Sequence, residues 1–303
     1  MYSKLIHILA IALLTATTAA AVNPVIELDG NNYEIDLDNC TAKAVCLKED
    51  NGTQTPCRNG EVPESVEYLG KRYLVTAIGA GAFAFSDIKK LTLPACVEGI
   101  EVFAFEDCHE LEVALIPATI KELPFAVFRH CEKLLAVGFT PLNVVEAEHR
   151  ELIQLEKIGS AAFSGCIKLV YFDFGLKLAH LGEDAFYGCS SLTSIVLPKT
   201  LSVIPEYAFA DCTRLLDVTL SSREIKMGAF SGCKSVSSIV IETPTQPAAS
   251  FAWDNAIFDT ASLYVPAGCI NAFKSEYPWN QFANITDSQP AADGVDLLIR
   301  DGH

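Results

Sequence analysis

The sequence is poor in basic residues and lacks the short motifs that mark common catalytic sites. Lysine and arginine total 22 against 38 aspartates and glutamates, so the net charge is −16. That field repels polyanions, which argues against nucleic acid and anionic membrane as partners. The chain has no Gly-x-Ser-x-Gly, no His-Glu-x-x-His and no phosphate-binding glycine loop. We therefore expect no enzyme activity, no cofactor and no metal site.

Long apolar runs are also scarce. The one marked run, Leu5–Leu14, follows Lys4 and leads to the small residues Ala19–Ala21. This order predicts a secretory signal peptide over residues 1–21, with a short buried helix as the alternative. No later run reaches the roughly 18 residues of a membrane span. We expect an exported, soluble protein at the cell surface, outside the cell or in the periplasm.

What the sequence does contain is a repeated Ala-Phe dipeptide or a close variant, usually followed three residues later by cysteine. The phenylalanines lie 22, 23, 35, 23, 23 and 21 residues apart, and repeats of about 20–29 residues are typical of leucine-rich-repeat solenoids. The phenylalanines are Phe83, Phe105, Phe128, Phe163, Phe186, Phe209 and Phe230, and the cysteines are Cys108, Cys131, Cys166, Cys189, Cys212 and Cys233.

A short strand precedes each dipeptide. In the best unit, Ile195 and Leu197 alternate inward and Pro198 ends the strand, because proline lacks a backbone donor. Stacked once per turn, such strands form a parallel sheet. The sequence thus predicts a repeat solenoid, a right-handed leucine-rich-repeat superhelix of the β/α type with a parallel sheet.

The ends of the array differ from its middle. Two hairpin patterns, around Gly30-Asn31 and around Leu69–Arg72, predict a small β cap that covers the first repeat. After residue 242 the repeat register is lost, which predicts an irregular α+β cap with a short helix at 270–277. The expected division is a signal peptide (1–21), an N-terminal β cap (22–75), a repeat array of about seven units (76–242), a C-terminal cap (243–286) and an unassigned tail (287–303).

The long interval between Phe128 and Phe163 carries about 12 extra residues, near 140–151. Insertions in repeat arrays form loops on one face and are often functional. A tolerated solvated loop is the equally open alternative.

The six repeat cysteines are expected to be buried free thiols, because stacked equivalents point in the same direction and no Cys-x-x-Cys pair starts a zinc site. One disulfide could form among the three cysteines of the N-terminal cap, Cys40, Cys46 and Cys57. We expect Cys96 and Cys269 to be unpaired. Two pairs of neighbours, Cys108-His109 and His130-Cys131, combine a thiol with an imidazole. If the cysteine side chain points into the core, the adjacent histidine side chain points to solvent. The two groups are then too far apart to act as a nucleophile and its base, which disfavours a catalytic pair.

The units resemble the BspA-type leucine-rich repeat. Residues 189–209 follow its pattern, Cys-x-x-Leu-x-x-Ile-x-Leu-Pro-x-x-Leu-x-x-Ile-Gly-x-x-Ala-Phe, except for Pro205 in place of glycine. The resemblance covers about residues 25–286. It implies a cell-surface or secreted protein of host-associated bacteria, in a family whose characterised members are adhesins for host matrix proteins or other bacteria. It names no ligand.

The surface left for function is the outward row of the sheet, the residues that alternate with buried strand positions. This row reads Lys90, Thr92, Val113, Leu115, Ala136, Gly138, Tyr171, Asp173, Ser194, Val196, Asp217, Thr219, Ser238 and Val240. From it we select as candidate binding residues Val113, Leu115, Tyr171, Asp173, Ser194, Val196, Asp217 and Thr219.

Tyr171, the only aromatic residue of the row, is the expected anchor for a flat partner. The leading hypothesis is a non-enzymatic exported binding protein that recognises a host or bacterial protein, or a glycan. The alternative is a structural spacer, or a scaffold of the envelope or of secretion, with no ligand on the repeats.

Overall fold

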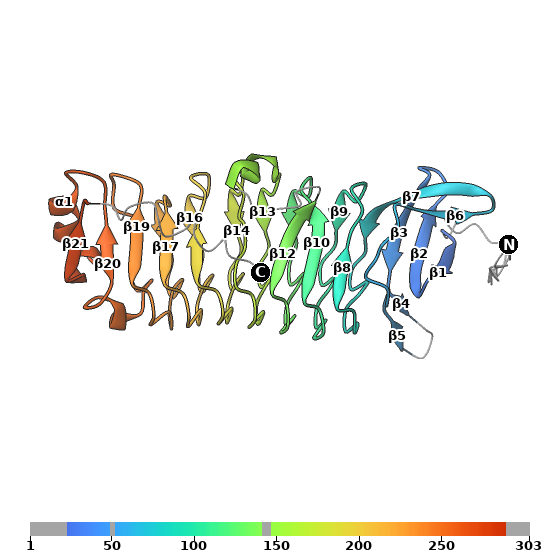
Figure 1. Cartoon of the computed structure of the whole chain (residues 1–303), viewed down its shortest axis with the longest axis horizontal. Helices are drawn as coiled ribbons and strands as arrows, with labels where there is room; N and C mark the ends of the chain where they lie inside the picture. The colour runs from blue at the N-terminus through green and yellow to red at the C-terminus, as the bar shows by residue number, and fades with distance from the viewer. Residues whose placement is uncertain (1–22, 49–51, 141–146, 289–303) are drawn as a thin grey trace.

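The computed structural model describes residues 23–48, 52–140 and 147–288 and shows an elongated β-solenoid with very little helix (Figure 1). Short strands stack side by side along the long axis, with a β cap at one end and helix α1 (Ile270–Ser275) at the other. The predicted signal peptide lies outside the described residues, as do residues 141–146 of the insertion and 289–303 of the tail. Within the described part, no helix is long or apolar enough to cross a membrane.

The N-terminal cap contains both expected hairpins, β1 with β2 and β6 with β7. Strand β7 also pairs in parallel with β3 and β9, so the cap continues into the solenoid through its backbone. Residues 60–62 exchange hydrogen bonds with Thr92 and cover the first edge of the sheet, which prevents pairing with another chain. The cap strands are β1 (Val25–Leu28), β2 (Asn31–Asp36), β3 (Thr41–Val45), β4 (Leu47–Lys48), β5 (Gln54–Thr55), β6 (Ser65–Tyr68) and β7 (Lys71–Ile78).

The expected parallel strands form what we call the front sheet. It consists of a three-stranded part, β8–β10–β12, and a five-stranded part, β15–β17–β19–β20–β21. Its strands are β8 (Lys90–Thr92), β10 (Val113–Pro117), β12 (Ala136–Thr140), β15 (Ser194–Val196), β17 (Asp217–Leu220), β19 (Ser238–Ile241), β20 (Ser262–Tyr264) and β21 (Asn284–Thr286).

A second row of two-residue strands, the back sheet, follows the front strands in each turn. They pair in parallel in three groups, β7 with β9, β11 with β13 and β14, and β16 with β18, for example Val203 with Glu224. They are β9 (Gly99–Ile100), β11 (Glu122–Leu123), β13 (Lys157–Ile158), β14 (His180–Leu181), β16 (Val203–Ile204) and β18 (Glu224–Ile225).

The Ala-Phe dipeptides close each turn on a third side, which we call the turn face. All seven phenylalanines are fully buried, and each ring lies against the next at centroid distances of 4.9–5.5 Å. Phe128 and Phe163 stack at 5.5 Å although 35 residues separate them, so the insertion leaves the column unbroken. We number the turns 1 to 7 by these rings, from Phe83 to Phe230.

The column continues past the last expected repeat. Trp253 stacks on Phe230 at 4.3 Å and 7°, and we count it as turn 8. Strands β20 and β21 likewise extend the front sheet, so the sheet does not stop at residue 242. Sequence analysis missed this turn because tryptophan replaces phenylalanine there, although Trp253 follows Phe230 by the usual 23 residues.

Beyond turn 8, aromatic side chains cover the end of the core. Trp279 and Phe282 are buried, and the Trp279 indole nitrogen donates to the Pro247 carbonyl. The helix expected over 270–277 is shorter, since α1 ends at Ser275 and Glu276 already has extended backbone geometry. The remaining short helical segments are η1 (Ala147–Leu152), η2 (Asn255–Ile257) and η3 (Trp279–Gln281).

The repeat cysteines form a second buried column. Each thiol donates to the carbonyl of the phenylalanine one turn earlier, for example Cys108 to Phe83 and Cys189 to Phe163, at 3.0 and 3.3 Å. Burial raises the pKa of the Cys189 thiol well above its usual value, so the thiol stays protonated and can donate. All eleven cysteines are free in the structure, including Cys40, Cys46 and Cys57.

The ring column makes a prediction about stability. Phe186→Ala removes a fully buried ring that touches both neighbouring rings and should lower the free energy of unfolding by about 3–5 kcal/mol. Leu176→Ala, at an exposed position, should cost less than about 0.5 kcal/mol. Chemical denaturation of the two variants measures both values, and equal costs would contradict the stacked column.

The cysteine column predicts a difference in thiol reactivity. The six column thiols should not react with an aromatic disulfide reagent in the native protein and should react once it is denatured. Titration of the denatured protein should find eleven free thiols. Fewer than about seven would mean that repeat cysteines form disulfides.

Candidate functional site

The candidate binding residues on strands all lie on the outward side of the front sheet. Burial alternates along each strand, with Ala114, Ile195 and Val218 buried and their neighbours partly or fully exposed. Sequence patterning predicts this arrangement, because side chains of a strand point alternately to its two faces. The outward residues are Val113 and Leu115 on β10, Ser194 and Val196 on β15, and Asp217 and Thr219 on β17.

The strand register brings part of this set together. Ser194 lies beside Asp217, and Val196 beside Thr219, on adjacent strands of the five-stranded part. Burial raises the pKa of the Asp217 carboxyl, and its hydrogen bond with Ser238 opposes that shift.

The other candidates belong to the three-stranded part of the sheet. Val113 pairs with Ala136, and Ala136 in turn forms an isolated bridge with Tyr171. Val113 and Tyr171 are therefore two strand positions apart on one face.

The segment around Tyr171 differs from the expected strand. Phe172 and Phe174 are buried, as the alternating pattern predicts. The segment does not form a strand ladder with β12, however, and pairs with it only through the single bridge at Tyr171. The Asp173 carboxylate accepts the Gly175 amide at 2.9 Å, so the chain turns where strand pairing would continue. The front sheet is divided here.

The end of the insertion is anchored at the same place. Arg150, in η1, donates through Nε to the Asp173 carboxylate at 2.9 Å and through a terminal nitrogen to the Gly175 carbonyl. Both side chains of this ion pair are about one-fifth exposed, which makes it stronger than a fully exposed pair. Asp173 thus positions the insertion and leaves fewer oxygens for a ligand.

Tyr171 lies beside this ion pair. Its pKa is raised to about 12, chiefly by burial and further by the Asp173 carboxylate, while Arg150 opposes the shift. The phenol is neutral at physiological pH and offers a ring and a hydroxyl to a partner.

Three exposed apolar residues next to the outward row were missed from the sequence. Leu135, Val170 and Leu216 each follow the inward leucine that opens a strand, where other turns carry Glu112 or Thr193. The Val170 amide donates to the Leu135 carbonyl, so these two residues are neighbours. Two consecutive apolar residues at the start of a strand could have identified these exposed positions from the sequence.

A second aromatic residue also lies in the outward row. Tyr264 on β20 pairs with Val240 and follows it in the same row. The sequence analysis did not include Tyr264 in the row because it did not recognise turn 8. The sequence Tyr264-Val265-Pro266, which repeats the pattern of a strand ended by proline, could have identified it.

The apolar and aromatic residues around the division of the front sheet are treated together below. We call Val113, Leu115, Leu135, Val170 and Tyr171 the central patch.

The pattern of strands, rings and cysteines agrees with comparisons to known families. The BspA type leucine rich repeat region matches residues 64–150 and 143–257, in six copies. The chain belongs to this family.

The chain also matches solved structures of bacterial leucine-rich repeat proteins. A Bacteroides ovatus protein has 22% identity and a TM-score of 0.60, and the match covers 79% of this chain and 57% of that one. A Treponema pallidum protein has 21% identity and a TM-score of 0.46, with 71% and 83% covered. A Faecalibacterium prausnitzii protein described as a leucine rich cell surface protein has 16% identity and a TM-score of 0.27, with 82% and 97% covered.

The first of these similarities shows the fold shared by this BspA-type chain. The chain spans little more than half of the length of the Bacteroides ovatus protein. Curated proteins gave no match.

The Cys-His neighbours of the BspA-type solenoid do not form a catalytic pair. Cys108 and Cys131 point into the core while His109 and His130 face solvent, so thiol and imidazole lie on opposite sides of the chain. No cluster of three or more His, Cys, Asp or Glu residues suited to a metal occurs among the described residues.

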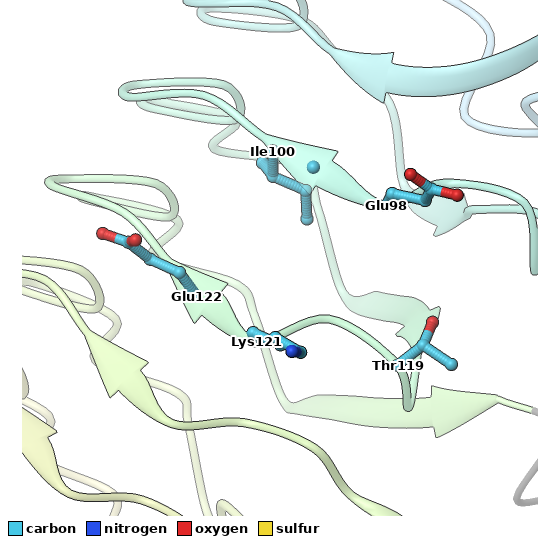
Figure 2. Close-up of a pocket in the computed structure, with 6 residues that line it drawn as sticks. Glu98, Ile100, Thr119, Lys121 and Glu122 are labelled. Carbon is cyan, nitrogen blue, oxygen red and sulfur yellow. The ribbon is translucent and has the colours of Figure 1, made fainter.

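A shallow depression on the back sheet lies between β9 and β11, which are not paired with each other. Ile100, Thr119 and Lys121 line it, and Figure 2 shows Glu98 and Glu122 on opposite sides of Ile100. Glu122 forms an ion pair with Lys157, outside the depression. These side chains do not converge on a common ligand.

The anchor at Arg150 leads to a prediction about local stability. Arg150→Gln removes the ion pair with Asp173, and the Ile153 amide, which donates to the Arg150 carbonyl, should exchange hydrogen about fivefold to tenfold faster, a loss of about 1 kcal/mol. Arg214→Gln, at an exposed position, is the matched control. Unchanged exchange at Ile153 in Arg150→Gln would show that the ion pair does not hold η1.

Proposed function

We propose that this protein is a non-enzymatic exported binding protein that recognises a host or bacterial protein through the front sheet. The observation that carries the proposal is the central patch, an apolar and aromatic area on an otherwise small and polar face. Leu135 and Val170 are 46% and 45% exposed, although apolar side chains of this size are usually buried. Extended repeat surfaces commonly serve as binding faces.

The surroundings of the central patch favour a protein partner. Ion pairs border it on both sides, Lys90 with Glu61 and Arg150 with Asp173. An apolar centre with an aromatic anchor and a charged margin is the usual anatomy of a protein interface. Family membership supports the same class of function.

The polar part of the face extends the surface toward the C-terminus. Ser194, Val196, Asp217 and Thr219 form a flat area that ends near Tyr264. In this proposal Tyr171 and the apolar residues supply most of the binding energy, and the flat area contributes shape complementarity.

Binding of residues 22–303 to fibronectin, fibrinogen and glycan panels tests the proposal. Tyr171→Ala and Leu135→Asp should each weaken binding at least about tenfold, since truncating an interface anchor costs about 1.4 kcal/mol or more. Ile167→Asp places the same charge at an exposed apolar position that does not belong to the patch and should leave affinity within about twofold.

Deletion of 140–151 tests the insertion separately. Binding that survives both central-patch variants would refute the assigned residues. Absence of binding to every panel member would contradict a binding function and favour a spacer. Binding to glycans alone would contradict a protein partner.

A further inference from the structure

The turn face carries aromatic side chains at positions where the backbone is left-handed. The residue two places before each stacked ring has positive φ, and it is glycine, alanine or aspartate in turns 1, 3, 4, 5 and 7. Turns 2, 6 and 8 instead have Phe103, Tyr207 and Phe251, with φ of 60°, 53° and 57°. Bulky residues rarely adopt this conformation because it is strained. An aromatic residue at this position is therefore a candidate for a functional role.

Turns 2 and 3 show what such an aromatic residue can hold. The Arg129 guanidinium lies 5.8 Å from the centre of the Phe103 ring and forms an ion pair with Glu106. One residue further along, His130 approaches the Asp107 carboxylate at 3.2 Å. In this part of the turn face, basic side chains of turn 3 therefore bind to the aromatic ring and the carboxylates of turn 2.

Turn 6 has the ring and one of the two acids of turn 2, and turn 7 lacks the bases of turn 3; Ala210 stands in place of Glu106. Tyr207 and Asp211 occupy the positions of Phe103 and Asp107, counted from the stacked rings. The positions of Arg129 and His130 are occupied by Ser231 and Gly232.

The side chains of turn 6 extend over the next turn. The Tyr207 ring lies across Gly228, and the Asp211 carboxylate lies over Gly232. Tyr187 of turn 5 hydrogen bonds with Asp211. Both residues of turn 6 are exposed to solvent, and their side chains lie over two glycines of turn 7 that are four residues apart.

An exposed aromatic strip continues from Tyr207 toward the C-terminus. The Gly228 amide donates to the Phe251 carbonyl, and the Phe251 and Tyr277 rings meet edge to face at 6.4 Å. The strip consists of Tyr207, Met227, Phe251 and Tyr277, with exposed fractions of 38%, 49%, 73% and 52%.

The margin of the strip is acidic. Glu183, Asp184, Glu206 and Asp211 have no ion-pair partner among the described residues. Lys226 is the basic residue nearest to the strip along the chain, next to Met227. Aromatic faces and carboxylates together complement a cation, and guanidinium stacks on rings better than ammonium does.

We propose that the turn face of turns 6 to 8 is a second binding surface, which takes an arginine-containing basic segment of a partner protein. A guanidinium of the partner stacks on the Tyr207 ring, as Arg129 lies over Phe103, and pairs with the Asp211 carboxylate, as His130 does with Asp107. The apolar stems of basic side chains pack along Met227, Phe251 and Tyr277. This surface is separate from the central patch, and either proposal can fail without the other.

The test measures the affinity of the purified protein for a fluorescent hexa-arginine peptide by anisotropy, with hexa-glutamate as the negative peptide. Tyr207→Ala and Asp211→Asn should each weaken hexa-arginine binding about fivefold or more, the effect of losing about 1 kcal/mol. Ser231→Arg should weaken it at least as much, because the new side chain occupies the position of Arg129 and fills the site from within.

Ser164→Arg is the matched control, since it adds the same charge at the equivalent position of turn 4, where turn 3 has Ala126 in place of the aromatic residue. It should change affinity by less than about twofold. Circular dichroism and the melting temperature confirm that each variant is folded. Tyr207, Asp211 and Ser231 are exposed, and Ser164 is partly exposed.

Failure of hexa-arginine to bind the wild-type protein would overturn the proposal. Equal weakening by Ser164→Arg and Ser231→Arg would also overturn it, because attraction to the net charge of −16 would then explain the binding. Binding that Tyr207→Ala and Asp211→Asn both retain would place the peptide elsewhere.

Discussion

The structure depends on one repeated backbone contact, the hydrogen bond from the amide of each stacked phenylalanine to the residue before the next one. Phe83 donates to Ala104, Phe186 to Ala208 and Phe230 to Ala252, each at 2.8 Å. Because equivalent residues then lie one above another at strand spacing, every side chain must tolerate contact with its own equivalent. Phenylalanine does so by stacking, and cysteine by donating to a carbonyl. Charged residues do so most favourably when the next turn supplies the opposite charge, as Arg129 does for Glu106.

This constraint explains why the interior was predictable. The 23-residue period, the inward strand positions and the buried free thiols follow from residues that recur at fixed spacing. Turn 8 was missed for the same reason, since Trp253 keeps the spacing but not the residue type. The division of the front sheet at Tyr171 depends on a contact between Arg150 and Asp173 that no periodicity encodes, because it joins the insertion to the array.

The surfaces were harder to predict because function depends on departures from the repeat. The outward row was located correctly, but its apolar neighbours Leu135 and Val170 break the pattern at a single strand position. Phe103, Tyr207 and Phe251 occupy backbone positions that the other turns fill with glycine, alanine or aspartate, and only the structure shows their left-handed geometry. The front sheet and the turn face also differ in chemistry. One presents an apolar centre and the other aromatic rings among carboxylates.

Both proposed surfaces require that the eight turns form one continuous stack. Site-resolved hydrogen exchange of the backbone amides tests this most directly, because each column amide is bonded to the following turn. The Phe230 amide, whose acceptor belongs to turn 8, should exchange as slowly as the Phe186 amide in the middle of the array. Fast exchange at Phe230 with slow exchange at Phe186 would show that turn 8 is not stacked on the array and would contradict the account.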